Sequence, residues 1–144
     1  DILNRYQIDP ALTEIELTET ALATNYKQVR QLFQELQQVH IRTTLDDFGS
    51  GYSVLNTVID IPANTIKIDR AFLDLCLSSD RGTYLLRHVI SIIKGLNYRV
   101  VCEGVESSQQ LEILQSTDCE EVQGFLFARP MSIEEYEAGA PACI

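Results

Sequence analysis

Strand-like segments alternate with helical segments along almost the whole chain of 144 residues, and this alternation is what most constrains the fold. Five segments have a short apolar or period-two pattern typical of β-strands: residues 14–17, 41–46, 65–69, 99–103 and 121–126. Between them lie longer segments in which apolar residues recur at helical spacing. Such an order predicts an α/β protein with a parallel sheet built from about five βα units.

Two of the intervening helices have well-defined apolar faces. After a polar loop at residues 18–20, Thr24 or Asn25 is expected to cap the first, with an apolar face made of Val29, Leu32, Phe33, Leu36 and Val39. Asp80 is expected to cap the second, with an apolar face made of Leu85, Val89, Ile92, Ile93 and Leu96. A shorter helix is predicted at residues 70–77. Two capping boxes, Ser107 with Gln110 and Ser132 with Glu135, predict where two further helices begin.

Polar residues stand at or near the C-terminal end of every predicted strand: Glu16, Asp46, Lys67, Glu103 and Gln123. A single charged residue at a strand end is usually a surface group. In a βα-barrel, however, these ends converge on one face, where active sites are built. A polar residue in five successive units therefore favours a shared site over five unrelated surface groups.

Two adjacent carboxylates, Asp46 and Asp47, precede a loop that contains Gly49 and Gly51. Adjacent carboxylates repel each other, so a fold that holds them together usually neutralises them with a cation. Hard divalent ions such as Mg²⁺ and Mn²⁺ prefer oxygen ligands of this kind. The simpler alternative is a turn in which one of the two aspartates caps the loop.

Composition excludes several classes of function. The net charge of −10 argues against binding of long nucleic acid, although a small phosphate ligand remains compatible with it because bound metal ions reverse the local charge. No apolar run is long enough to span a membrane, and the N-terminus does not read as a signal peptide. The chain begins without Met and is expected to be cut from a longer protein. His40 and His88 are expected to be structural.

The cysteines stand at positions 76, 102, 119 and 143, with no C-x-x-C spacing that would indicate a zinc or redox motif. They are interpreted as reduced, mostly buried thiols, which predicts a cytoplasmic location.

Five short segments together resemble the EAL family of cyclic di-GMP phosphodiesterases: residues 14–19 (EIELTE), 45–53 (LDDFGSGYS), 66–69 (IKID), 102–106 (CEGVE) and 122–125 (VQGF). The resemblance covers residues 3–138. It implies the C-terminal portion of a TIM-like (β/α)₈ barrel, with residues 1–144 forming a partial EAL domain and residues 139–144 a loose tail. It also implies bacterial second-messenger signalling, in which cyclic di-GMP is hydrolysed to linear pGpG with Mg²⁺ or Mn²⁺, two ions in the complete domain.

The resemblance also assigns roles to residues. Glu16 and Asp46 resemble ligands of the first metal ion, and Asp47 resembles the residue that holds the second ion or a bridging water. Lys67 resembles the lysine that orients the attacking water, and Glu103 the essential glutamate that acts as general base or second-metal ligand.

Three further residues have supporting roles in the family. Glu19 resembles the residue that anchors the glycine loop, Glu106 a second glutamate of the site, and Gln123 a residue that orients water or substrate. The resemblance assigns no substrate-binding residue.

The chain also departs from the family pattern. The Glu-Ala-Leu segment and a metal-binding asparagine are absent, together with the first strands of the barrel. Two alternatives therefore stay open: a cyclic di-GMP receptor or interaction module without turnover, and a metal-dependent hydrolase with another substrate. Open sheet edges predict a homodimer or association with the missing N-terminal segment. The resemblance implies that a dimer would form near the glycine loop, which makes residues 48–54 the candidate contact. Val100, Cys102 and Val122 are expected to line an inner face that has lost its cover.

Overall fold

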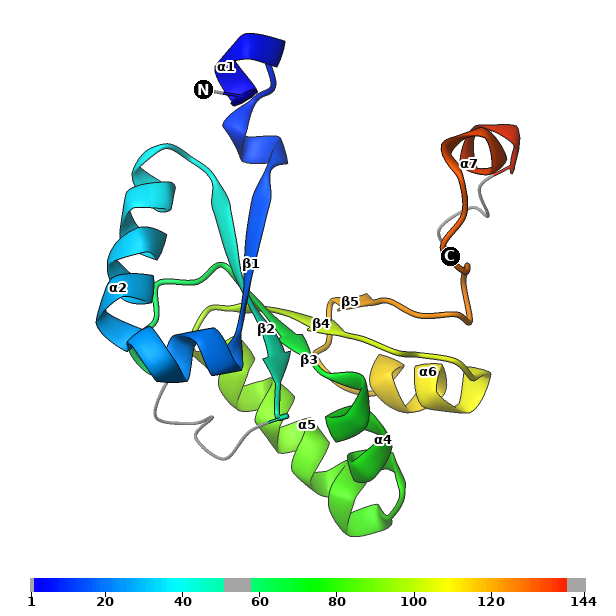
Figure 1. Cartoon of the computed structure of the whole chain (residues 1–144). Helices are drawn as coiled ribbons and strands as arrows, with labels where there is room; N and C mark the ends of the chain where they lie inside the picture. Colours follow the sequence, from blue (N-terminus) through cyan, green and yellow to red (C-terminus); the bar gives the residue numbers. More distant parts are fainter. Residues whose placement is uncertain (1, 51–57, 140–144) are drawn as a thin grey trace.

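The computed structural model describes residues 2–50 and 58–139, which form a parallel sheet with helices packed around it (Figure 1). The strands are β1 (Glu14–Thr18), β2 (Arg42–Phe48), β3 (Thr65–Ile68), β4 (Arg99–Cys102) and β5 (Glu121–Val122). Their spatial order is β1-β2-β3-β4-β5, and every neighbouring pair is parallel. Each strand thus lies beside the next strand in sequence, which confirms the predicted α/β class and its five units.

The helices are α1 (Ile2–Tyr6), α2 (Glu19–Gln38), α4 (Arg70–Leu77), α5 (Asp80–Gly95), α6 (Ser108–Gln115) and α7 (Ile133–Gly139), with a 3₁₀ turn at Pro10–Leu12. In the described residues, α2 connects β1 to β2, α4 and α5 connect β3 to β4, and α6 connects β4 to β5, whereas α1 precedes the sheet and α7 follows it. In Figure 1, α2, α4, α5 and α6 lie close to the sheet, whereas α1 and α7 stand away from it. No helix in the described part of the chain is long and apolar enough to cross a membrane. Gly139 ends α7, and residues 140–144 of the predicted tail lie outside the described residues.

The hydrophobic core lies between the sheet and its helices. Leu45, Ile66 and Val100 are at most 1% exposed on the helix-facing side of the strands, and Phe33 of α2 and Ile90 of α5 belong to the same buried cluster. Burial of each such side chain contributes roughly 1.5–3 kcal/mol. The expectation that Val100 and Cys102 line an uncovered inner face is wrong, because both are fully buried. Val122 is half-buried and packs against the same core.

The opposite face of the sheet is polar. Thr44 of β2 and Thr65 of β3 both donate hydrogen bonds to Glu14 Oε1 of β1, the second at 2.8 Å. Thr44 and Thr65 are at most 3% exposed, so these bonds satisfy hydroxyls that would otherwise be costly to bury. Residues at alternate positions along a strand share a face, so Glu16, Asp46 and Lys67 lie on this polar side as well.

Helix α2 begins earlier than predicted. The Thr18 hydroxyl accepts a hydrogen bond from the backbone N–H of Ala21, so residues 19 and 20 are the first turn of the helix and not part of a loop. The predicted start nevertheless marks a real irregularity, because Asn25 has φ −137° and ψ 43°, which kinks the helix there. Of the predicted apolar face, Val29 and Phe33 are buried, but Leu32 is 41% exposed, and Val39, which caps the C-terminal end of α2, is 52% exposed.

The prediction for the start and the apolar face of α5 is wrong in part. Ser79, not Asp80, is the N-cap, and its hydroxyl accepts from the Gly82 N–H at 3.1 Å. The buried face consists of Leu86, Val89, Ile90 and Ile93. The prediction is wrong for Leu85, Ile92 and Leu96, which are between 39% and 50% exposed.

The remaining segments follow the prediction more closely. Helix α4 has the predicted bounds, and both capping boxes are present, at Ser107 with Gln110 and at Ser132 with Glu135. Strand β5 is shorter than predicted and ends at Val122. The Gln123 N–H still donates to the Cys102 carbonyl, so the chain stays beside β4 for one more residue.

Candidate active site

Lys67 lies at the centre of the candidate site, on the polar face of β3. Its Nζ is 2.6 Å from Glu103 Oε1, 3.1 Å from Glu16 Oε2 and 3.5 Å from Asp46 Oδ1. Glu16 comes from β1, Asp46 from β2 and Glu103 directly follows β4, so four neighbouring strands each supply one charged group. The structure therefore brings together four of the five strand-end residues that the sequence singled out.

The four charged side chains differ in their access to water. The Lys67 side chain is 11% exposed, those of Asp46 and Glu103 are 21% and 22% exposed, and that of Glu16 is 48% exposed. Burial opposes the charge on Lys67, but hydrogen bonds to Glu103 and Glu16 and the nearby charge of Asp46 raise its pKa above the usual lysine value. Lys67 is therefore a permanent cation at neutral pH, and it offsets the repulsion among the carboxylates.

Asp47 occupies a left-handed backbone conformation within β2, with φ 57°. The register between β2 and β3 shifts between Leu45 and Phe48, which indicates a bulge at this pair of aspartates. The backbone N–H of Asp47 donates to Asp46 Oδ1 at 3.0 Å. Burial raises the pKa of the Asp47 carboxyl, and so do the charges of Asp46 and Asp69, while Lys67 lowers it. The bulge thus holds the second aspartate close to other negative groups.

Glu19 and Phe72 fix the start of the glycine loop. Glu19 is only 5% exposed, and its Oε2 accepts a hydrogen bond from the Gly49 N–H at 3.3 Å. Gly49 has φ +100°, and a Cβ at this position would lie 2.5 Å from Phe72 Cγ, so only glycine fits. Phe48, the first residue of the predicted contact at 48–54, is 1% exposed and belongs to the core, so its side chain is not on the surface. Gly49 and Ser50 are the other described residues of this contact, and residues 51–54 lie outside the described residues.

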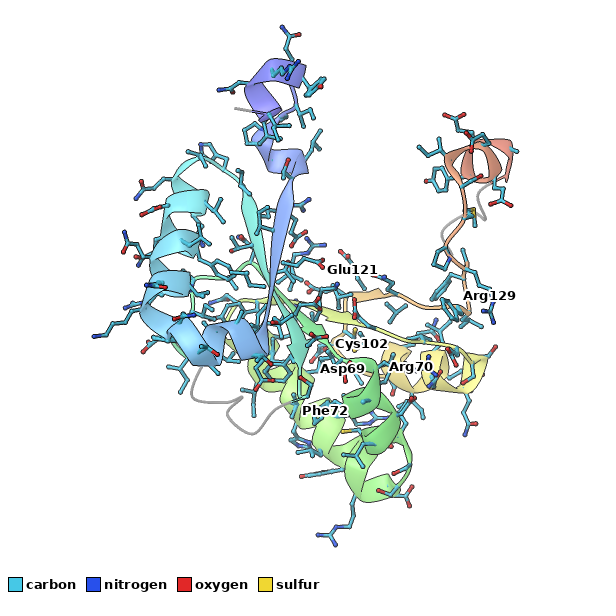
Figure 2. The ribbon with its side chains drawn as sticks, in the orientation of Figure 1. Asp69, Arg70, Phe72, Cys102, Glu121 and Arg129 are labelled. Carbon is cyan, nitrogen blue, oxygen red and sulfur yellow. The ribbon has the colours of Figure 1, made fainter. Side chains whose placement is uncertain are left out.

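Arg70 joins two strand-end loops, a role that the sequence pattern does not predict. Its guanidinium makes a two-point contact with the Glu106 carboxylate, at 2.7 and 3.0 Å, and also lies 3.5 Å from Asp74. Its side chain packs against Gly104, which has φ +71°. Asp69, which directly precedes Arg70, caps α4 by accepting from the Ala71 and Phe72 N–H groups. Figure 2 labels Asp69, Arg70 and Phe72 at the start of α4. Asp69 and Arg70 stand two and three residues after Lys67, at the end of the same strand, and this position was the signal available in the sequence.

Gln123 is exposed, and its backbone pairs with β4 and with the Val105 N–H. The structure brings its backbone to the same end of the sheet but records no contact of its side chain with Lys67. Glu106 is likewise engaged by Arg70 and not by Lys67.

The carboxylate set has the chemistry that Mg²⁺ or Mn²⁺ requires, since Glu16, Asp46, Asp47 and Glu103 supply only oxygen donors. In residues 2–50 and 58–139, no three carboxylate, imidazole or thiol side chains are grouped so that they could hold an ion. Three of these carboxylates are instead grouped around the Lys67 ammonium.

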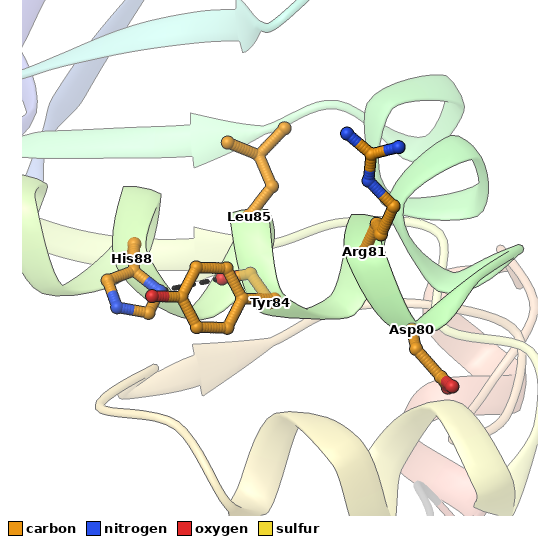
Figure 3. Close-up of a pocket in the computed structure, with 5 residues that line it drawn as sticks. All are labelled: Asp80, Arg81, Tyr84, Leu85 and His88. Carbon is orange, nitrogen blue, oxygen red and sulfur yellow. Dashed lines mark hydrogen bonds between the residues drawn. The ribbon is translucent and has the colours of Figure 1, made fainter.

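A separate hollow lies on the outer surface of α5 (Figure 3). It has a volume of about 710 Å³ and is lined by Asp80, Arg81, Tyr84, Leu85 and His88. His88 Nδ1 lies 2.8 Å from the Tyr84 carbonyl oxygen, and the two rings are 4.1 Å apart, so His88 has local structural partners as expected. None of the residues around Lys67 lines this hollow.

Comparison with known proteins places the chain among EAL domains. A sequence profile of the EAL domain family matches residues 1–130. The cyclic di-GMP phosphodiesterase NbdA of Pseudomonas aeruginosa is 38% identical over 124 residues, which are 86% of this chain and 16% of NbdA. The chain spans about a fifth of the length of the curated relatives it matches.

Solved structures agree with this assignment. The cyclic di-GMP complex of the PaMucR phosphodiesterase has a TM-score of 0.84 at 31% identity, over 92% of this chain and 54% of that one. The manganese and cyclic di-GMP complex of Klebsiella pneumoniae BlrP1 has a TM-score of 0.81 at 32% identity, over 89% and 33% of the two chains. The likeness confirms the predicted fold class, part of a TIM-like barrel. The EAL profile matches the chain from before β1 to past β5, and the relatives include proteins named cyclic di-GMP phosphodiesterases. This chain therefore belongs to the EAL domain family.

Proposed function

We propose that the protein to which this chain belongs hydrolyses cyclic di-GMP to linear pGpG in the cytoplasm, with Mg²⁺ or Mn²⁺, and that this chain supplies the C-terminal part of the active site. The observation that carries the proposal is the convergence of Glu16, Asp46 and Glu103 on Lys67 from four neighbouring strands. Relatives that are named cyclic di-GMP phosphodiesterases support the substrate, and the manganese complex of BlrP1 supports the use of a divalent ion.

Each residue has a chemical task in this proposal. In the parent protein, Glu16, Asp46 and Asp47 would hold divalent ions together with the further ligands that the resemblance implies, and such ions would polarise a phosphate and lower the pKa of a bound water. Glu103, held by Lys67 at 2.6 Å, accepts the proton of the attacking water. Lys67 orients this carboxylate and offsets the negative charge that develops on the phosphate. Gln123 orients water or substrate from the end of β5, and Glu19 holds the glycine loop through the Gly49 N–H.

The test uses the full-length parent protein, cyclic di-GMP and either Mg²⁺ or Mn²⁺, with pGpG measured by chromatography. Glu103→Gln and Lys67→Met should each remove most of the turnover, because their roles are in the chemical step. Glu112→Gln, at an exposed position of α6, is the matched control and should retain activity. Near-normal turnover by either site variant would refute the roles assigned here.

Binding of cyclic di-GMP, measured by calorimetry in the same proteins, separates the proposed phosphodiesterase from a cyclic di-GMP receptor without turnover. The proposal is supported if the unmodified parent forms pGpG and its Glu103→Gln variant still binds cyclic di-GMP. Tight binding by the unmodified parent without any pGpG would instead support a receptor.

A further inference from the structure

Two cysteines that the proposed function does not use lie in contact with each other. Cys102 ends β4 and is fully buried, and Cys119 lies between α6 and β5 and is partly buried. Their sulfur atoms are 3.4 Å apart, although the two residues are 17 positions apart in the sequence. Figure 2 labels Cys102 within the sheet, close to the start of α4 in the view.

The backbone on both sides holds this arrangement in place. Cys102 pairs with Val122 in the β4–β5 ladder, and its carbonyl accepts from the Gln123 N–H at 2.9 Å. Cys119 Sγ lies 3.1 Å from the Glu121 carbonyl oxygen, and its backbone N–H donates to Thr117 Oγ1. The two sulfurs are therefore kept close by secondary structure and by a turn, and not by a chance meeting of mobile side chains.

The distance suits a disulfide bond. A disulfide has an S–S length of about 2.05 Å, so the sulfurs would have to approach each other by roughly 1.4 Å from their present 3.4 Å. Small rotations about the two Cα–Cβ bonds supply such a movement without separating the strands. The alternative is that both thiols act as small apolar groups, as Cys76 does, which is 2% exposed and whose pKa is raised by burial alone.

Cys119 differs from Cys76 in ways that favour reaction. It is partly exposed, so a small oxidant can reach it, whereas Cys102 is fully covered. The hydrogen bond that it shares with Cys102 lowers the pKa of Cys119, and burial opposes this only in part. A partly exposed thiol with a lowered pKa beside a second thiol is the usual setting of an attacking and a resolving cysteine.

We propose that Cys119 and Cys102 are a redox modification site, which a peroxide converts reversibly into a disulfide between β4 and the segment before β5. The Cys119 thiolate attacks one peroxide oxygen, the O–O bond breaks, and Cys119 becomes a sulfenic acid while hydroxide leaves. The Cys102 sulfur then attacks the Cys119 sulfur, the S–O bond breaks, and the second oxygen leaves as water with the proton of Cys102. Two thiols lose two electrons, and hydrogen peroxide becomes two waters. A dithiol restores both thiols by exchange.

The location gives the modification a consequence. Cys102 directly precedes Glu103, and Cys119 lies four residues before Gln123, so the new bond would join two segments that lead into the candidate active site. In a reducing cytoplasm such a bond is expected to be transient and to respond to oxidants. Formation of the bond itself does not depend on the proposed function.

The test maps the bond directly in the full chain of residues 1–144. Purified reduced protein is treated with hydrogen peroxide, remaining thiols are alkylated, and the chain is digested with trypsin and a glutamate-specific protease without reductant. Each relevant cysteine then falls in its own peptide: residues 100–103, 113–120 and 138–144. Mass spectrometry should show the first two peptides joined, and released by dithiothreitol.

Variants provide the matched controls. Cys143→Ser should form the same bond, and Cys119→Ser should lose it completely. In Cys102→Ala, dimedone should label Cys119 after peroxide treatment, because the sulfenic acid has lost its resolving partner. When the protein is unfolded in urea before it is treated with peroxide, the same digest should no longer show a preference for linkage between peptides 100–103 and 113–120. Unlinked peptides 100–103 and 113–120 in the native chain, linkage of 113–120 to 138–144 instead, or no dimedone adduct on Cys119 would overturn the proposal.

Discussion

Replacing Lys67 with methionine should destabilise the chain more than the loss of an ordinary ion pair. Methionine keeps the unbranched apolar stem of lysine, so the change removes mainly the ammonium group. Lys67 makes two hydrogen bonds to carboxylates, at 2.6 and 3.1 Å, and has a third carboxylate at 3.5 Å. Hydrogen bonds that involve charged groups contribute roughly 1.5–3 kcal/mol each. Glu16 is half-exposed and screened by water, so we expect a total loss of about 2–3 kcal/mol in the free energy of unfolding at pH 7.

Lys94→Met is the matched control, since Lys94, on the surface of α5, also pairs with a glutamate, Glu120, which directly precedes β5. The two partners are 30% and 40% exposed, so this change should cost at most about 1 kcal/mol. Urea unfolding followed by circular dichroism, at one protein concentration for all variants, measures both differences. Equal losses in the two variants would refute the view that the Lys67 cluster is an unusually strong electrostatic centre.

The pH dependence of the same difference adds a second check. The folded-state pKa of Lys67 is raised, so its stabilising contribution is fully present below the ordinary lysine value of 10.5. It is lost only as the pH rises from that value toward the higher folded-state pKa. The difference between the unmodified chain and Lys67→Met should therefore stay constant from pH 7 to about pH 10 and shrink above it. A difference that already falls between pH 7 and pH 9 would contradict this sign.

Other changes give further expectations. Gly49→Ala should lower the free energy of unfolding, measured in urea, by roughly 1–3 kcal/mol, because φ is +100° and the new Cβ meets Phe72. Gly95→Ala, with open space around the new Cβ, should leave this free energy unchanged or raise it slightly. Ser107→Ala removes the cap of α6 and should cost about 1 kcal/mol in the same measurement. Burial raises the pKa of Glu14, but hydrogen bonds from two threonines and the charges of Arg42 and Arg99 together lower it below its ordinary value of 4.5. The advantage of the unmodified chain over Glu14→Gln in the free energy of unfolding should therefore be present at pH 7 and shrink as the pH falls below 4.5. The chain alone should bind Mg²⁺ weakly in a calorimetric titration and form little or no pGpG, because it lacks two ligands that the resemblance implies.

The sequence predicted the parallel sheet and the group around Lys67 for the same reason. Period-two strands such as Ile66–Lys67–Ile68 specify which face is apolar, so the polar residue at each strand end had to fall on the opposite face. The face of α5 was harder to predict, because Leu85 and Leu86 are adjacent apolar residues, and either can begin a stripe of helical spacing. Packing against β4 selects Leu86, and that information lies outside the helix itself.

Two contacts could not be predicted because they join distant segments through side-chain geometry. Arg70 reaches Glu106 across 36 residues, and Cys119 reaches Cys102 across 17. Neither residue stands in a spacing that indicates its partner. The bulge at Asp47 depends on the register between β2 and β3, which the strand pattern of either segment alone does not specify.

The edges of the sheet lead to a last prediction, on assembly. In the described residues, β1 and β5 end the sheet, and each is paired on one side only. Apolar side chains are exposed beside β1, with Leu12 76% and Ile15 37% exposed. Because unpaired strand edges with apolar neighbours are templates for pairing with another chain, we expect the purified chain to self-associate. Ile15→Lys should shift sedimentation toward the monomer, since a charge beside the edge opposes pairing. Leu75→Lys, at an equally apolar but distant position of α4 that is 69% exposed, should leave the distribution unchanged. A compact monomer with a cooperative thermal transition at every concentration would show that the five strands are stable with both edges open, and that edge pairing does not drive assembly.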